Sequence, residues 1–248
     1  MTQVITTTTA ATENIIPART PLVRYSILTA TIALAAAVLM LAWPRFQASF
    51  RYLPVDLAIE RYFATREIPS DRLAVLIRFA NQAISIHDDY RYHNGLSLLQ
   101  QLRAIDLNTP ALERIDAYRA AEAEAVESLK QSPAQPMAWL AIANIRWILR
   151  DEAAEIISPW KMSIFTGRTD SSLIVQRIEI GLAYREYMDA EAIAMFRDQL
   201  LLGWRMQPGS VMQVLAHRDA DLRVTGDLIA NTDPAALAEM EAWLGKLR

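Results

Sequence analysis

The sequence feature that most constrains the fold is an uncharged apolar run from Tyr25 to Pro44, bounded by Arg24 and Arg45. At about 1.5 Å rise per residue, a helix of this length spans roughly 30 Å, the thickness of a bilayer's hydrocarbon core. A core helix of a globular domain, the first alternative, usually keeps a polar stripe, whereas only hydroxyl side chains interrupt this run. We therefore predict a transmembrane helix over 25–44.

A cleaved signal peptide is the second alternative to a retained anchor. Its apolar core would be shorter, and its cleavage site requires small residues in an A-x-A-like pattern. The best downstream position is Ala48, but bulky Phe46 occupies the place where a small side chain is needed. The pattern favours a signal-anchor that stays in the membrane.

The orientation of the anchor is predicted from segment lengths. Positive charge is almost balanced across the run, with Arg19 and Arg24 before it and Arg45 and Arg51 after it, so the positive-inside rule gives little direction. A short tail, one early apolar segment and a long following domain are typical of an anchor that exports its C-terminal part. We expect a single-pass protein of the bacterial inner membrane with a periplasmic C-terminal domain.

The rest of the chain divides around this anchor. The Thr-rich segment 1–24 lacks helical periodicity, which predicts a disordered cytoplasmic tail. Pro44 is expected to end the anchor helix, and 45–69 is expected to be a juxtamembrane linker with a short helix opened by Pro54. The segment 70–248 is long enough for one domain with its own core.

The segment 70–248 is predicted to be all-α, because it has almost no alternating β-branched run that would indicate a strand. Helix starts are expected at Ser70, at Thr109 before Pro110, and at Asp233 before Pro234. Apolar residues recur at helical spacing in two early helices and in the last one. These stripes are Leu73, Leu76, Ile77, Ala80 and Ile84, then Leu96, Leu98, Leu99 and Leu102, and finally Leu237, Met240 and Leu244.

Two segments resemble the tetratricopeptide repeat. The first contains Ala121, Ala125, Ser128 and Pro133, followed by Trp139, Ile142, Ala143 and Arg146, and the second contains Ile180, Gly181, Tyr184, Ala192 and Phe196. The first departs from the repeat at Ala125, where a large aromatic is usual, and at Arg146, where Tyr is usual. The resemblance implies an irregular tetratricopeptide-like helical-repeat domain in which Trp139 is buried between helix pairs; a non-repeat helical bundle is the alternative.

Composition excludes several functional classes. A net charge of -3 argues against a nucleic-acid surface, which needs a concentrated cationic patch. The chain has no Cys, so it forms no disulfide and has no thiolate metal site or Cys nucleophile. Its seven glycines are scattered singly, so no phosphate-binding loop is indicated. We expect no cofactor.

Few side chains are candidates for chemistry. The only metal-capable cluster in the sequence is His87, Asp88, Asp89 and His93, but positions six apart do not share a helical face, so an interhelical loop or cap is favoured over a metal site. His217, with Arg218 and Asp219, is interpreted as a solvated helix end.

Neighbouring carboxylates and tryptophans are likewise interpreted as structural. The pairs Asp151 with Glu152 and Glu122 with Glu124 are interpreted as exposed helix charges. Four tryptophans are interpreted as core rather than as a shelf for sugars: Trp139, Trp147, Trp160 and Trp204. No catalytic, cofactor-binding or metal-binding residue is assigned.

The run SLKQSPAQPMAWLAIANIRW on a single-anchor chain of this length resembles small membrane proteins of bacterial polysaccharide biosynthesis and export clusters. Together with a helix-pair array, the resemblance implies a non-catalytic scaffold that holds inner-membrane or periplasmic proteins beside the bilayer. The alternative is an assembly factor or chaperone of another envelope complex, respiratory or secretory. An enzyme is the least favoured class, and direct contact with polysaccharide has no support in the sequence.

Overall fold

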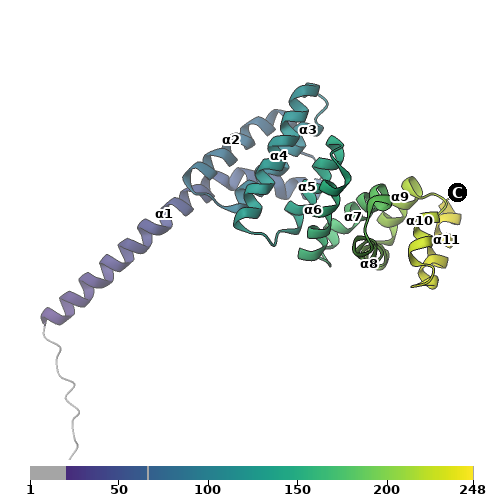
Figure 1. Cartoon of the computed structure of the whole chain (residues 1–248). Coiled ribbons are helices and arrows are strands. Elements are labelled where there is room, and N and C mark those ends of the chain that lie inside the picture. The colour runs from purple at the N-terminus through teal and green to yellow at the C-terminus, as the bar shows by residue number, and fades with distance from the viewer. Residues whose placement is uncertain (1–20, 66, 248) are drawn as a thin grey trace, which may run out of the picture. The chain divides into compact units, whose positions relative to one another are not determined.

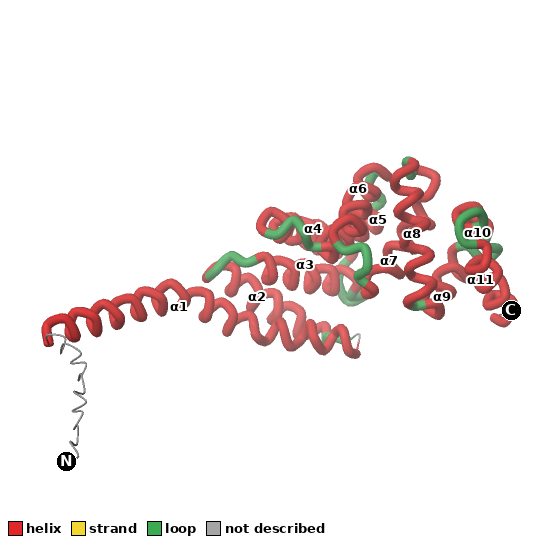
Figure 2. The backbone as a smooth tube through the Cα atoms, turned by 90° about the horizontal axis from the view of Figure 1, so that it is seen from below, coloured by secondary structure: helices red, strands yellow, loops and turns green. Residues whose placement is uncertain are grey.

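The computed structural model describes residues 21–65 and 67–247, and these residues form helices joined by short loops (Figures 1 and 2). The described part contains no strand, which confirms the all-α prediction. The chain divides into two compact units between Phe46 and Gln47. The helices are α1 (Pro21–Thr65), α2 (Ser70–Ile86), α3 (Tyr90–Ile105), α4 (Ala111–Gln131), α5 (Pro136–Leu149), α6 (Ala153–Thr166), α7 (Ser171–Tyr184), the 3-10 turn η1 (Arg185–Tyr187), α8 (Ala190–Met206), α9 (Pro208–Arg218), α10 (Arg223–Ile229) and α11 (Pro234–Leu247).

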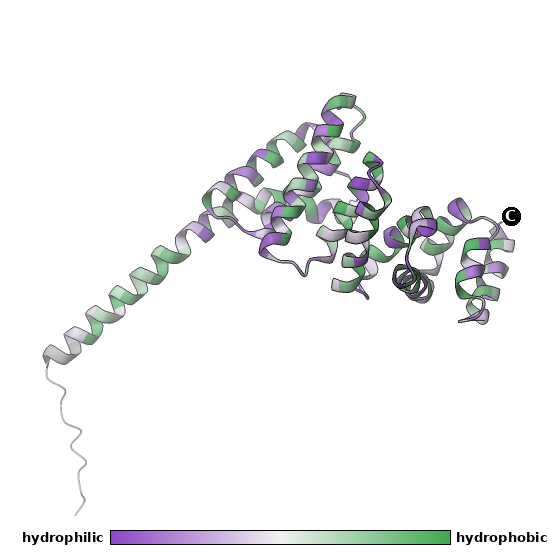
Figure 3. Cartoon of the chain, viewed as in Figure 1, coloured by the Kyte–Doolittle hydropathy of each residue, from purple (hydrophilic) through white to green (hydrophobic). Residues whose placement is uncertain are grey.

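The first unit consists, as far as it is described, of the apolar N-terminal part of α1 (Figure 3). By length and composition this helix can cross a membrane. The hydroxyls of Thr29 and Thr31 donate to the carbonyl oxygens four residues earlier, at 2.8 and 2.9 Å, so the helix itself satisfies them, as lipid requires. Of the tail predicted over 1–24, only 21–24 are described, and these belong to α1.

The predicted helix end at Pro44 and the linker over 45–69 are wrong, because α1 continues through Pro44 and Pro54 to Thr65. Each proline removes one backbone hydrogen bond. In the second unit, tertiary packing outweighs this loss, since Ala48, Tyr52 and Val55 are buried at helical spacing.

The contact between α1 and α3 depends on a glycine. The Tyr52 hydroxyl lies against Gly95 of α3, where a Cβ atom would come within 1.6 Å of it, and it donates to the Arg91 carbonyl at 3.3 Å. The hydroxyls of Ser49 and Tyr92 share a further hydrogen bond of 3.0 Å. These contacts make residues 47–65 part of the helical domain rather than a linker.

Helix starts fall at or next to the predicted positions. Ser70 is the first residue of α2 rather than its N-cap, and α4 begins at Ala111, so both predictions are displaced by about one residue. The last prediction is confirmed, because the Asp233 carboxylate accepts from the Ala236 N–H at 3.1 Å and Pro234 opens α11.

The predicted apolar stripes form the inner faces of their helices. One cluster joins α1, α2 and α3, and a larger one extends from α5 to α11. The residues of these stripes that are buried are Leu73, Leu76, Ala80, Leu96, Leu99, Leu102, Met240 and Leu244.

Small residues of α3 and α4 lie where these two helices pack together. Ala121, Ala125 and Ser128 of α4 have no exposed surface, and the Ser97 hydroxyl of α3 donates to the Ala121 carbonyl at 2.7 Å. Because these side chains of α4 are small, α4 packs closely along α3.

A second close approach joins α7 and α8. A Cβ atom on Gly181 would lie 2.6 Å from the Phe196 ring, which is fully buried. The absence of a side chain at Gly181 therefore lets α7 and α8 approach closely.

Trp139 is not buried between helix pairs, contrary to the prediction. It is half-buried at the start of α5, and its indole N–H donates to the Pro133 carbonyl in the preceding loop at 2.8 Å. The tryptophan without exposed surface is Trp160 of α6, whose N–H donates to the Arg177 carbonyl at 2.9 Å.

Arg177 of α7 is fully buried, although charged side chains are usually exposed. Its guanidinium donates to the Ser163 hydroxyl at 2.9 Å and carbonyl at 2.7 Å, to the Gly167 carbonyl at 2.9 Å, and to the Gln199 side chain at 3.2 Å. These acceptors belong to α6, the turn after it, and α8, so one side chain joins them to α7.

Substituting Gly181 tests the contact between α7 and α8. Gly181→Ala should lower the free energy of unfolding by about 1–3 kcal/mol, because the added methyl overlaps the Phe196 ring. Gly209→Ala is the matched control: no atom lies within 4 Å of its Cβ position, so the change should be neutral or stabilise by about 0.5–1 kcal/mol. Denaturant unfolding of the full chain measures both, and equal effects would contradict the close approach.

Candidate functional site

Alternate helices of the second unit line a groove with a volume of about 480 Å³. Most of its lining comes from the C-terminal part of α1 and from α3, α5 and α7, with Tyr118 of α4 and Gln207 at the end of α8 completing it. The volume lies within the roughly 300–1,000 Å³ range of ligand pockets.

The groove carries no formal charge. None of its lining residues is Asp, Glu, Lys or Arg, although these types make up 21% of the chain. Phe63, Ile105, Met137 and Ile148 contribute large exposed apolar side chains. The surface therefore favours an uncharged ligand with apolar groups.

Three amide side chains from successive lining helices are open to a ligand. Asn94 of α3, Asn144 of α5 and Gln176 of α7 are half-buried in the groove, and within the described residues their side chains make no hydrogen bond to the protein. Each primary amide offers donors and an acceptor, which matches the N–H and C=O groups of a peptide backbone. Sequence reasoning did not identify these residues, because no local pattern indicates that Asn94, Asn144 and Gln176 line one groove.

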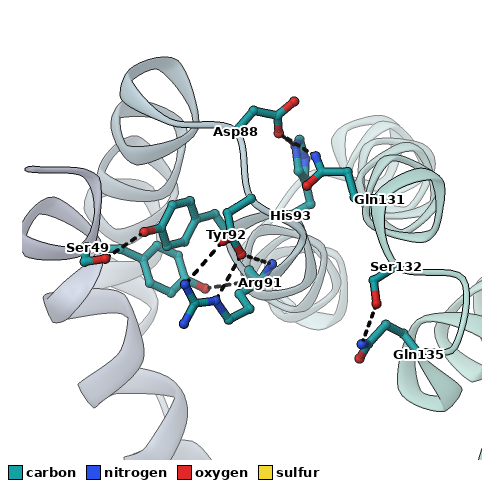
Figure 4. Close-up of polar contacts among 10 residues, drawn as sticks. Ser49, Asp88, Arg91, Tyr92, His93, Gln131, Ser132 and Gln135 are labelled. Atoms are coloured by element: carbon teal, nitrogen blue, oxygen red, sulfur yellow. Dashed lines mark hydrogen bonds and ion pairs between the residues drawn. The ribbon is translucent and has the colours of Figure 1, made fainter. Parts of the chain in front are cut away.

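A second polar cluster joins the α2–α3 loop to α4. His93 Nδ1 lies 2.6 Å from Glu124 Oε2, and His93 Nε2 lies 2.7 Å from Asp88 Oδ1. The Gln131 amide also donates to Asp88 Oδ1 at 2.7 Å, beside the His93 ring (Figure 4). Because carboxylates only accept, two such bonds require both ring nitrogens to donate, which makes His93 an imidazolium.

The electrostatics of this cluster agree with its geometry. The hydrogen bond to Glu124 is the main cause that raises the pKa of His93, with Asp88 adding to it. The hydrogen bonds from His93 and Gln131 lower the pKa of Asp88. The His93 ring is buried, but the Asp88 side chain is 67% exposed, so solvent screens that ion pair more than the pair with Glu124.

The loop predicted around the early histidines is shorter than expected. Residues 87–89 connect the helices, and α3 already begins at Tyr90. Asp89 is the N-cap of α3, accepting from the Arg91 N–H at 3.0 Å, while His87 ends α2. Among residues 21–65 and 67–247, no group of three or more metal-capable side chains is arranged to hold a metal ion.

The interpretation of the acidic pairs as exposed helix charges is wrong for three of the four residues. Glu124 binds His93, and Glu122 accepts from Arg119 at 3.0 Å and from Arg146. Asp151, in the loop after α5, forms two bonds with Arg119, which lower its pKa. The charges of Glu122 and Asp151 are satisfied where α4 packs against α5 and the following loop, and that of Glu124 where α4 packs against α3.

The group after α9 is also divided by the structure. His217 is exposed in the last turn of α9, as predicted. Asp219 is buried rather than solvated, because its carboxylate accepts from the Val224 and Thr225 N–H groups at 3.1 and 2.8 Å and caps α10. Trp160 and Trp204 are buried as predicted, whereas Trp147 is only partly buried.

Comparisons with known proteins give no relative from which function can be transferred. No protein-family model matches the chain. No curated protein matches it, and no solved structure does. The functional assignment therefore depends on the groove and on the apolar helix.

His93 should make stability depend on pH. A raised pKa means that its contribution is complete below about pH 6.5, the unfolded value, and is lost as pH rises through the folded value. His93→Gln should remove this loss, since glutamine does not titrate, and should lower stability at acidic pH. His217→Gln, at an exposed site, is the control and should keep the wild-type profile. Thermal unfolding of the full chain against pH measures all three; identical profiles for the wild type and His93→Gln would exclude the imidazolium.

Proposed function

We propose that this protein is a non-catalytic, membrane-anchored scaffold that binds a partner polypeptide in the groove of its helical domain. The observation that carries the proposal is the row of amides at Asn94, Asn144 and Gln176, which have no partner in the described part of the chain. Side-chain amides that are unpaired within the described fold and face one groove favour a ligand that forms hydrogen bonds with them.

The chemistry of the groove favours a polypeptide. Side-chain amides bind a main chain whatever its sequence, while the apolar side chains of Phe63, Ile105, Met137 and Ile148 offer contacts for alternate residues of the bound segment. The lack of charge favours an uncharged segment, because a buried charge without a partner is costly.

The helix order supports a tetratricopeptide-like reading of the domain. From α5 to α9 each helix contacts the next one, α10 contacts α11, and α5 with α7, α6 with α8, α7 with α9, α8 with α10 and α9 with α11 also pack. Stacked helix pairs produce this nearest-neighbour pattern and give extended concave surfaces that bind other proteins.

The apolar part of α1 gives this scaffold its location. We assign it as a single-pass anchor in a bacterial inner membrane, with the helical domain in the periplasm. The resemblance of the run from Ser128 to Trp147 then favours envelope polysaccharide biosynthesis or export as the process served.

The orientation predicts the behaviour of reporter fusions. Alkaline phosphatase fused after Arg248 should be active, because the long domain is exported behind a short tail, whereas the same enzyme fused before Met1 should be inactive. Release of the wild type should require detergent. Activity only in the N-terminal fusion would reverse the orientation, and a protein soluble without detergent would remove the anchor.

The groove predicts which substitutions abolish partner capture. Asn144→Leu with Gln176→Leu should reduce the yield of crosslinked partner from membranes about tenfold. Two hydrogen bonds to the partner, of roughly 0.5–1.5 kcal/mol each, are lost, whereas no hydrogen bond within the described part of the protein is lost. Gln213→Leu, exposed on α9 outside the groove, is the matched control and should leave the yield unchanged.

The identity of the captured proteins indicates which process the scaffold serves, and a complementation test shows whether His87 and His217 are needed for function. Polysaccharide-assembly proteins among the captured partners would support the proposed process, and respiratory or secretion components would replace it with an assembly-factor role. Substitution of His87 or His217 should leave complementation of a deletion strain intact. Equal capture by the groove variant and the wild type, with both folded, would refute the scaffold site.

A further inference from the structure

A second cavity, of about 700 Å³, lies between α8, α9 and α11, apart from the groove described above. Its prominent side chains are Trp204, Arg205, Asp233, Glu239, Trp243 and Lys246. Alanines of α11 and Pro208 fill the remaining wall, so little bulk projects into the space. The cavity thus combines a flat aromatic surface with charged groups of both signs.

The two indoles form a fixed pair. Trp204 is buried, and its ring lies 5.7 Å from that of Trp243 at an interplanar angle of 76°, a favourable T-shaped contact. Trp243 is nevertheless 39% exposed. An exposed indole held by a buried one offers a preoriented apolar surface, whose binding costs little side-chain entropy.

Polar groups surround this surface. The Trp204 N–H donates to Glu239 Oε2 at 3.1 Å, which positions that carboxylate. Glu239, Trp243 and Lys246 recur at helical spacing along one side of α11. Across the cavity, Arg205 pairs with Asp233 at 3.3 Å. Carboxylate acceptors and cationic donors are therefore both present beside the ring.

We propose that this cavity is a saccharide-binding site. A pyranose ring has an apolar C–H face that can lie on the Trp243 indole and a rim of hydroxyls that can donate to Glu239 and Asp233 and accept from Arg205 and Lys246. The site goes beyond the proposed scaffold function, because it uses different helices and a different kind of ligand from the groove.

The same features disfavour other occupants. An acyl chain needs an apolar lining, yet four charged side chains border this cavity. A polyproline segment can stack on tryptophan but leaves most of those donors and acceptors unpaired. A saccharide can both stack on the Trp243 ring and form hydrogen bonds with the charged side chains around it.

Binding of linear oligosaccharides to the full chain in lipid nanodiscs tests the proposal, since nanodiscs avoid sugar-based detergents. The probes are maltohexaose, cellohexaose and a hexamer of galacturonic acid, followed by calorimetry and tryptophan fluorescence. At least one should bind saturably. Trp243→Ala should weaken that binding about tenfold or more, and Trp243→Phe should restore part of it. Glu239→Gln, which keeps the shape of the side chain, should also weaken it.

Controls separate loss of the site from loss of the fold. Trp139→Ala, at a half-buried indole outside the cavity, should bind as the wild type does, and the melting temperature of each variant reports folding. The groove variant Asn144→Leu with Gln176→Leu should keep its sugar affinity, so a failed scaffold proposal would not affect this result. No saturable binding of any of the three probes, affinity unchanged in folded Trp243→Ala and Glu239→Gln, or binding of decaproline at this cavity instead would each overturn the proposal.

Discussion

The buried guanidinium of Arg177 is the interaction on which the central part of the domain depends. The acceptors of its hydrogen bonds are neutral oxygens, and these bonds, with the charge of Asp170 adding to them, compensate its loss of water. Burial lowers its pKa to about 10, which still leaves it charged at neutral pH. A charge of this kind stays buried only if every acceptor keeps its place, and the acceptors come from α6, the turn after it and α8. The positions of these helices are therefore coupled, and Trp160 adds to the coupling by donating to the Arg177 carbonyl.

Local patterns in the sequence predict the helices but not what holds them together. The leucine stripes follow from spacing, because helical periodicity places their side chains on one face, and the capping by Asp233 follows from its place before Pro234. The end of α1 does not follow from spacing. Proline normally ends a helix, but α1 continues through Pro44 and Pro54, and near Pro54 the packing of Tyr52 on Gly95, which lies far along the chain, outweighs the lost hydrogen bond.

The polar clusters are also difficult to predict from the sequence, because residues that interact lie far apart along the chain. His93 and Asp88 are close in the chain, but the partner that completes the cluster, Glu124, is on another helix, and nothing local indicates the pair. Asp151 and Arg119 are similarly separated, so an ion pair was interpreted as a free surface charge. Buried arginine is harder still to predict, because its residue type favours an exposed position, although helical spacing from Leu173 and Gly181 places Arg177 on the buried face of α7.

Because most enclosed polar groups have hydrogen-bond partners, the few polar side chains without one are informative. In the described part of the chain, only Gln100 Oε1 and Ser128 Oγ are buried side-chain atoms without a hydrogen bond, so the fold satisfies almost every polar group that it encloses. The groove amides belong to the same packed helices and yet have no partner there. Water can serve them while the groove is empty, at little cost, and a bound main chain can replace that water with bonds of similar strength. Selectivity of the groove would then come from its apolar side chains and from the exclusion of charge, whereas the amides would supply affinity that tolerates sequence change in the partner.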